Sequence, residues 1–204
     1  MAHNAFFRDS NYEDDPGDSS SKPMYLTSPT QLPAGTDPQA DALGRRRLVL
    51  CGQPNVGKSL IFNLLTGRYA AVSNYPGTTV TISHGTSPRM PGLEILDTPG
   101  TYSLMPLTEE ERVTRDVLLE SPGAIVVHVV DAKNLRRMLP MTLELLEMKR
   151  RVVLVLNMMD ELEELGVSVE AALLEQRLGI PVVPMVAVRG EGMDRLAGAL
   201  DRDR

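Results

Sequence analysis

The sequence predicts an α/β domain whose mostly parallel sheet has about six strands and carries helices on both faces. The first observation behind this class is an alternation, from residue 47 onward, of short apolar runs with runs of helical periodicity. The second is that the runs 125–130 and 152–156 are almost continuously apolar, as strands covered on both faces should be. We therefore expect these two runs to form buried strands.

The individual elements follow from the same alternation. Strands are expected over 47–51, 79–86, 92–97, 124–130, 152–157 and 181–187, and helices over 58–66, 109–120, 140–149, 169–179 and 191–201. Residues 79–86 alternate polar and apolar side chains, which indicates a strand with one face in solvent. Pro140 would break a helix that began at Lys133, so we expect a helix to begin at Pro140 itself.

Composition divides the chain into a tail and one folded domain. Residues 1–44 are rich in Ser, Pro, Asp and Gly and show neither helical nor strand periodicity, which predicts a disordered acidic tail. The chain has a net charge of −6, and seven acidic against two basic residues place −5 of it in this tail. Residues 45–204 are almost neutral. The domain therefore lacks the basic footprint of a nucleic-acid-binding protein, and we expect no nucleic-acid partner.

The sequence favours a cytoplasmic location. Cys51 is the single cysteine, so a disulfide framework is excluded. No apolar run approaches the roughly 18 residues of a membrane span, and acidic residues follow the short apolar run near the N-terminus, unlike a signal peptide. The three histidines lack carboxylates or cysteines at ligand spacing, so we expect no metal site from them.

The segment GQPNVGKS, residues 52–59, lies between an apolar run and a helical pattern, which is the context of a phosphate-binding loop. Gly52 and Gly57 let successive N–H groups converge on one point, and the helix that follows adds the positive end of its dipole. Lys58 would reach the β- and γ-phosphates, and the Ser59 hydroxyl would bind Mg²⁺. The residues expected to hold the nucleotide here are Gly52, Asn55, Val56, Gly57, Lys58, Ser59 and Leu60.

Polar motifs also follow three later strands, where ligands bind in such sheets. Asp97, the first residue of DTPG, can hold Mg²⁺ through water, and the Gly100 N–H can face a γ-phosphate. Asp160, the last residue of NMMD, can accept hydrogen bonds from the N1–H and N2 amino group of guanine, which adenine cannot offer. A backbone N–H of residues 186–188 could meet the guanine O6. Taken alone, DTPG could equally be a simple turn, and NMMD could equally be the N-terminal cap of a helix.

This order of motifs resembles the translation-factor-like GTPases of the Era/TrmE type, and more closely the G domain of ferrous iron transport protein B (FeoB). The narrower resemblance rests on Leu64–Gly67, Asn74–Val80, Asp97–Leu104, Glu109–Arg112, Asn157–Glu161, Val182–Pro184 and Gly190–Gly192, and covers roughly residues 46–200. It implies a Ras-like P-loop NTPase fold, guanine-nucleotide binding and slow hydrolysis of GTP to GDP. In that fold Asn157, Met158, Asp160, Val186, Ala187 and Val188 would surround the base.

The resemblance also implies metal sites and catalytic roles. Thr79 would be the switch threonine that closes over Mg²⁺ and the γ-phosphate, joining Ser59 and Asp97 as Mg²⁺ ligands. Asn55 would bind a K⁺ ion that bridges the phosphates, with backbone carbonyls from the loop around Asn74; the alternative is a turn residue with an unusual backbone angle. Thr101 stands where a water-orienting glutamine is usual, so K⁺ would replace an arginine finger. The expected catalytic residues are thus Lys58, Thr79, Gly100 and Asn55.

The chain departs from the resemblance in three places. Met158 replaces the lysine of the usual NKxD motif, and Val186–Ala187 replaces a serine–alanine pair, which suggests weaker binding or faster GDP release. The helical regulatory domain and membrane channel that follow the G domain in the family are not expected within residues 45–204. The resemblance implies an iron-transport membrane component, in the same or a neighbouring frame, as a partner. As part of such a transporter, this domain would lie at the inner face of the cell membrane. The alternatives are a ribosome-associated assembly GTPase, which would want a basic appendage, and a non-catalytic nucleotide sensor.

Overall fold

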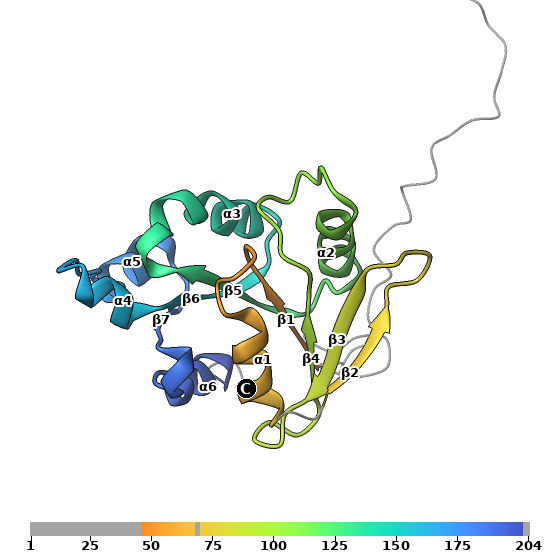
Figure 1. Cartoon of the computed structure of the whole chain (residues 1–204), viewed down its shortest axis with the longest axis horizontal. Helices are drawn as coiled ribbons and strands as arrows, with labels where there is room; N and C mark the ends of the chain where they lie inside the picture. The colour runs from red at the N-terminus through yellow and green to blue at the C-terminus, as the bar shows by residue number, and fades with distance from the viewer. Residues whose placement is uncertain (1–45, 68–69, 202–204) are drawn as a thin grey trace, which may run out of the picture. The chain divides into compact units, whose positions relative to one another are not determined.

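The computed structural model describes residues 46–67 and 70–201. The tail expected over residues 1–44 therefore lies outside the described residues. Seven strands form one sheet in the order β2-β3-β4-β1-β5-β6-β7 (Figure 1). The strands are β1 (Arg46–Cys51), β2 (Ala70–Asn74), β3 (Thr81–Thr86), β4 (Leu93–Asp97), β5 (Ile125–Asp131), β6 (Arg151–Asn157) and β7 (Val182–Pro184). This confirms the predicted α/β class.

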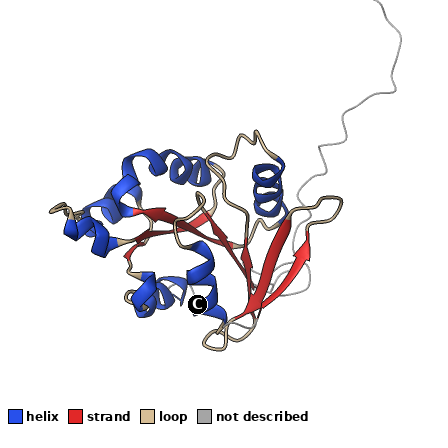
Figure 2. Cartoon of the chain, viewed as in Figure 1, coloured by secondary structure: helices blue, strands red, loops and turns tan. Residues whose placement is uncertain are grey.

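The five strands from β4 to β7 pair in parallel, while β3 is antiparallel to both β4 and β2. The helices are α1 (Lys58–Thr66), α2 (Glu109–Glu120), α3 (Leu135–Glu147), α4 (Met159–Glu164), α5 (Ala171–Leu178) and α6 (Met193–Asp201), with short 3-10 turns η1 (Ala132–Asn134) and η2 (Ala187–Arg189). Helices α1 and α6 lie on one face of the sheet, and α2 and α3 lie on the other (Figures 1 and 2). Helices α2, α3 and the α4–α5 pair each connect two parallel strands of the sheet, the arrangement expected of crossover connections.

The central strands form the core because their sequences carry almost no polar side chains. All seven residues of β5 are buried, and so are six of the seven in β6. His128 is the polar exception in the middle of β5, and its Nδ1 lies 2.9 Å from the Thr142 hydroxyl on α3. Within the described residues, no helix is both long enough and apolar enough to cross a membrane.

The structure differs from the expected elements in four places, one of which is the short helix α4, where no helix was predicted. Strand β2 was not predicted, because all five of its residues are exposed at the edge of the sheet and show no buried face. The last strand ends at Pro184 rather than 187, since η2 begins at Ala187. Helix α3 begins at Leu135 and contains Pro140, contrary to the expected start at that proline. Pro140 and Arg136 are both exposed, so solvent can hydrate the Arg136 carbonyl that the proline leaves without a donor.

Candidate functional site

The candidate site lies at the carboxyl edge of the parallel strands, where the loops after β1, β4, β6 and β7 meet. The phosphate loop itself turns tightly between β1 and α1. Gly52 has a φ of +141° and Gly57 a φ of +93°, conformations that side chains with a Cβ rarely adopt. A Cβ on Gly52 would lie 2.2 Å from the Val129 carbonyl oxygen, and one on Gly57 would lie 2.3 Å from Nδ2 of Asn157. A side chain at position 52 would thus clash with backbone and one at position 57 with the buried Asn157 amide, so both positions require glycine.

Lys58 lies at the centre of this loop, with its side chain curled back onto the backbone. Its ammonium donates a 3.0 Å hydrogen bond to the carbonyl oxygen of Gln53. Burial lowers the pKa of Lys58, while the nearby Asp97 carboxylate acts in the opposite direction. A buried ammonium with one neutral hydrogen-bond partner is well placed to take an anionic one.

Ser59 and Asp97 were both expected at a Mg²⁺ ion, and the structure brings them together. The Ser59 hydroxyl donates a 2.7 Å hydrogen bond to Oδ2 of Asp97. The other carboxylate oxygen, Oδ1, is buried and has no hydrogen-bond partner. Burial raises the pKa of Asp97, whereas the Ser59 hydrogen bond and the Lys58 charge lower it. This oxygen pair suits Mg²⁺, which takes one or two protein oxygens together with water and phosphate oxygens.

No cluster of three or more His, Cys, Asp or Glu residues that could hold a metal by itself occurs in the part of the chain that the structure describes. His3 lies outside the described residues, and neither His84 nor His128 belongs to such a cluster within them. Any Mg²⁺ at Ser59 and Asp97 would depend on the ligand's own oxygens to complete its coordination.

A cavity of about 450 Å³ opens beside these residues, between the phosphate loop and the loop after β4. Its lining includes Lys58, Ser59, Thr79, Val80, Thr81, Ser83, Asp97, Thr98, Pro99, Gly100 and Glu110. Thr79 is exposed at this cavity, so it can change position without disturbing the core. A Cβ on Gly100 would lie 2.6 Å from the Pro54 ring, which shows how closely the two loops pack. The structure thus brings together the residues expected around the γ-phosphate.

Thr98 and Thr101 fasten the DTPG loop to the end of β1. The Thr98 hydroxyl donates to the Leu50 carbonyl oxygen at 2.8 Å, and the Thr101 N–H donates to the Gly52 carbonyl oxygen at 3.0 Å. The Thr101 side chain is fully buried and donates to the Ser103 carbonyl oxygen at 2.8 Å. Residue 101 therefore directs its hydroxyl into the protein and leaves no side chain to orient a water molecule.

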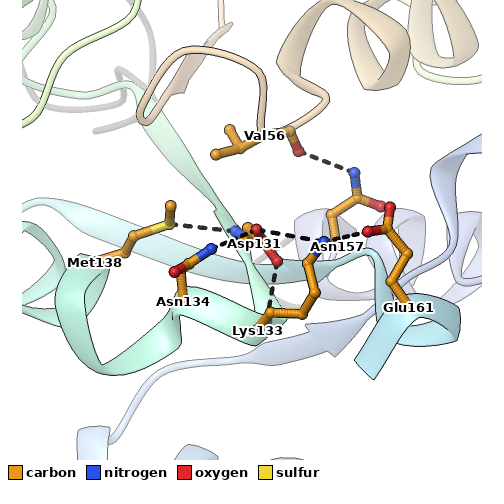
Figure 3. Close-up of polar contacts among 7 residues, drawn as sticks. All are labelled: Val56, Asp131, Lys133, Asn134, Met138, Asn157 and Glu161. Carbon is orange, nitrogen blue, oxygen red and sulfur yellow. Dashed lines mark hydrogen bonds and ion pairs between the residues drawn. The ribbon is translucent and has the colours of Figure 1, made fainter. Parts of the chain in front are cut away.

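Asn157 joins the phosphate side of the site to the base side. Its Nδ2 donates to the Val56 carbonyl oxygen at 2.9 Å (Figure 3). Its Oδ1 accepts the Ala187 N–H at 3.0 Å. The Val186 N–H is also engaged within the protein, with the Glu191 carbonyl oxygen at 3.1 Å. Of the three residues expected near the guanine O6, Val188 is thus the best candidate, and its side chain is 76% exposed.

Met158 and Asp160 begin the segment expected to read the base. Met158 takes a left-handed conformation, with a φ of 63°, and turns the chain from β6 into α4. Asp160 follows in the first turn of α4, half-buried, and Oδ2 lies 3.3 Å from a guanidinium nitrogen of Arg189. Asn55, within the phosphate loop, also has a φ of 63°, which agrees with the alternative that it is a turn residue with an unusual backbone angle. Its side chain is exposed.

Three charged residues near the base side were not predicted, namely Asp131, Lys133 and Arg189. Asp131 is the last residue of β5 and Lys133 lies two residues beyond it, so the rule that ligands bind beyond strand ends could have found them. Arg189 gave no sequence signal, because its distance from Asp160 depends on how η2 folds. Leu60, predicted to contact the nucleotide, is half-exposed on the first turn of α1.

A phosphate loop after β1, a DTPG loop after β4 and an Asn-x-x-Asp motif after β6, on this sheet, define the class of P-loop GTPases with a Ras-like fold. A family model described as Ferrous iron transport protein B matches residues 46–200. The chain belongs to this family.

Similar proteins and structures agree with that assignment. The Fe(2+) transporter FeoB of Escherichia coli (strain K12) is 39% identical over 158 residues, which are 75% of this chain and 20% of the relative. A Fe(2+) transport protein A/FeoB fusion protein of Porphyromonas gingivalis (strain ATCC BAA-308 / W83) is 43% identical over 156 residues, 76% of this chain and 18% of the relative. The chain thus spans about a fifth of the length of these curated relatives.

Two solved structures show the same fold. The G domain of the T. maritima FeoB iron transporter superposes with a TM-score of 0.70 at 37% identity, covering 76% of this chain and 96% of that one. A mutant of S. thermophilus NFeoB bound to GDP gives a TM-score of 0.72 at 39% identity, covering 75% of this chain and 60% of that one.

Proposed function

We propose that residues 46–201 bind GTP and GDP and hydrolyse GTP slowly. The observation that carries this proposal is the Ser59–Asp97 contact at the cavity that the phosphate loop and the Gly100 loop share, with Lys58 beside it. A phosphate group there would meet the Lys58 ammonium, converging backbone N–H groups and the N-terminus of α1. The GDP bound to the S. thermophilus NFeoB mutant supports the choice of ligand.

On the base side, we propose that Asp160 selects guanine. Both of its carboxylate oxygens are needed for the N1–H and N2 donors of the base, so Arg189 would have to release the one it contacts. Discrimination of this kind is strong, since a base without those donors leaves a carboxylate unpaired. Met158 contributes only apolar contact next to this carboxylate.

We propose that Mg²⁺ is held by Ser59 and Thr79 and, through water, by Asp97. Bound there with GTP, Mg²⁺ neutralises charge on the phosphate oxygens. Lys58 leaves the Gln53 carbonyl to pair with those oxygens, and the Gly100 N–H points at the γ-phosphate. Because the Thr101 hydroxyl is committed inside the protein, the remaining compensation of charge falls to a K⁺ ion at Asn55.

We further propose that this domain acts as the nucleotide-dependent switch of a ferrous iron transporter. The relatives named above are Fe(2+) transporters about five times longer than the matched segment. Residues 68–80 and 98–110 would differ between the GTP and GDP states, because γ-phosphate contacts order such segments. Thr79, Val80 and Gly100 of these segments line the cavity. The membrane component would lie in the same or a neighbouring chain, which places this domain at the cytoplasmic face of the membrane.

Hydrolysis of GTP by the purified chain, measured with excess Mg²⁺ in potassium and in sodium salts, tests the enzymatic proposal. We expect turnover roughly tenfold faster in potassium, within the range that electrostatic stabilisation supplies. Asn55→Ala should remove the difference between the salts, while the control Asn63→Ala on the exposed face of α1 should keep it. Negligible turnover in both salts, with GDP still bound, would contradict hydrolysis and favour a non-catalytic sensor.

A further inference from the structure

A chain of polar contacts follows β5 and reaches the helix that carries Asp160 (Figure 3). Asp131, the last residue of β5, pairs in register with Asn157, the last residue of β6. The Asp131 carboxylate accepts the Lys133 N–H at 2.9 Å and the Asn134 side-chain amide at 2.8 Å, so it fixes the start of η1. From there the Lys133 ammonium forms an ion pair with Glu161 on α4 and lies 3.9 Å from Asp131.

Helix α4 has few other anchors, among them the partly buried Met159, which packs against the core and donates its N–H to the Met185 carbonyl oxygen at 3.3 Å. It has six residues, and Leu162 is its one buried residue. A helix this short is marginal without tertiary contacts. The residue that precedes α4 is Met158, whose left-handed backbone conformation costs free energy that neighbouring contacts must offset.

Two cations hold the first turn of α4 from neighbouring strand ends. Arg189, after β7, pairs with Asp160, and Lys133, after β5, pairs with Glu161. Guanine has to displace Arg189, since base and guanidinium compete for the same carboxylate oxygen. Lys133 pairs with the adjacent residue, so its contact can persist while the base is bound. Glu161, Asp131 and Asp160 all raise the pKa of Lys133, the hydrogen bond to Glu161 most of all, which agrees with its position among these carboxylates.

We propose that Lys133 is a positioning residue for guanine recognition, which orients Asp160 by holding Glu161 at the start of α4. This inference rests on the proposed function. Lys133 does not touch the base. It fixes the helical turn from which Asp160 meets the N1–H and N2 donors of the base. Met158, which follows β6, carries no charge, and Lys133, which follows β5, provides a cation in the same region.

The test compares binding of GDP with binding of inosine diphosphate, which lacks the N2 amino group, by fluorescence competition. Lys133→Met removes the charge and keeps the stem, and Glu161→Gln removes the other partner. We expect each variant to weaken GDP binding about threefold, as expected for a partly exposed ion pair, and to reduce the preference for GDP over inosine diphosphate by a similar factor. The charge exchange Lys133→Glu with Glu161→Lys should restore part of both values, because it also brings a carboxylate close to Asp131. Arg137→Met, on the neighbouring turn of α3, should change neither.

A general loss of stability would weaken both nucleotides equally and leave the preference unchanged, which distinguishes structural damage from loss of positioning. GDP binding by the unaltered chain with an unchanged preference in Lys133→Met would overturn this inference alone. Failure of the charge exchange to restore any part of the preference would also overturn it. If the unaltered chain binds no GDP, the proposed function fails and this inference fails with it.

Discussion

His128 is a titratable side chain in the middle of the core. It is fully buried on β5, its Nδ1 lies 2.9 Å from the Thr142 hydroxyl, and its Nε2 has no hydrogen-bond partner. Burial lowers the pKa of His128 from 6.5 to about 3, and the positive charge of Lys58 acts in the same direction. The imidazole is therefore neutral in the folded protein at every pH at which the protein is expected to work.

This neutral imidazole predicts a loss of stability in acid. Below pH 6.5 the unfolded chain takes up a proton on His128 that the folded chain does not, so the free energy of unfolding falls as pH falls toward 3. Between pH 7 and pH 5 the contribution of this residue is about 2 kcal/mol. Urea denaturation at both pH values should show a smaller decrease in His128→Asn than in the unaltered chain. Equal decreases would contradict the assignment.

At the scale of elements, Asn157 at the end of β6 connects two loops from distant parts of the sequence, the phosphate loop and the turn after β7. One amide group holds the phosphate loop through Val56 and the turn after β7 through Ala187, and it sits where a Cβ on Gly57 would fall. The side chain is 3% exposed, so water cannot replace either hydrogen bond. The Asn of the Asn-x-x-Asp motif thus fixes the positions of these loops, and we expect it to affect a bound nucleotide through them.

Replacing Asn157 by Ala should therefore affect both folding and binding. It leaves the Val56 carbonyl and the Ala187 N–H buried without partners, which costs about 1–3 kcal/mol of unfolding free energy. We expect GDP affinity to fall by at least tenfold, because the phosphate loop and the base loop lose their common support. Chemical denaturation and GDP titration check this, with Asn63→Ala as an exposed control. A variant as stable and as tight-binding as the control would contradict the role.

The sequence predicted six of the seven strands because most of them are apolar and bounded by Gly, Pro or Asp. It could not predict β2, whose pairing with β3 is held by backbone hydrogen bonds with every side chain exposed. The same limit applies to the site. The proximity of Ser59 and Asp97 could be predicted because both lie in recognisable motifs at the ends of neighbouring strands. The Arg189–Asp160 pair depends on a distance set by folding, which no spacing of residues reveals.

At the scale of the whole molecule, the strand order separates two halves of one site. The end of β1 carries the phosphate loop, and its neighbour β4 carries Asp97 and Gly100. On the other side, Asp160 and Val188 lie in the segments that follow β6 and β7. Strand β5 lies between β1 and β6 and so separates the two halves. A nucleotide laid across this edge would meet its phosphate contacts over one half and its base contacts over the other.

The central claim is that this edge binds a guanine nucleotide through Asp160, and exchange of one side chain tests it most directly. Asp160→Asn replaces a carboxylate oxygen, which accepts a hydrogen bond, with an amide NH2 group, which donates one. The variant therefore suits xanthine, whose O2 atom accepts a hydrogen bond where guanine has its N2 amino group. We predict that the unaltered chain binds GDP at least 100-fold more tightly than xanthosine diphosphate, and that Asp160→Asn reverses the preference, a change of about 3 kcal/mol or more. An unchanged preference for GDP in Asp160→Asn would contradict the assignment of the base site.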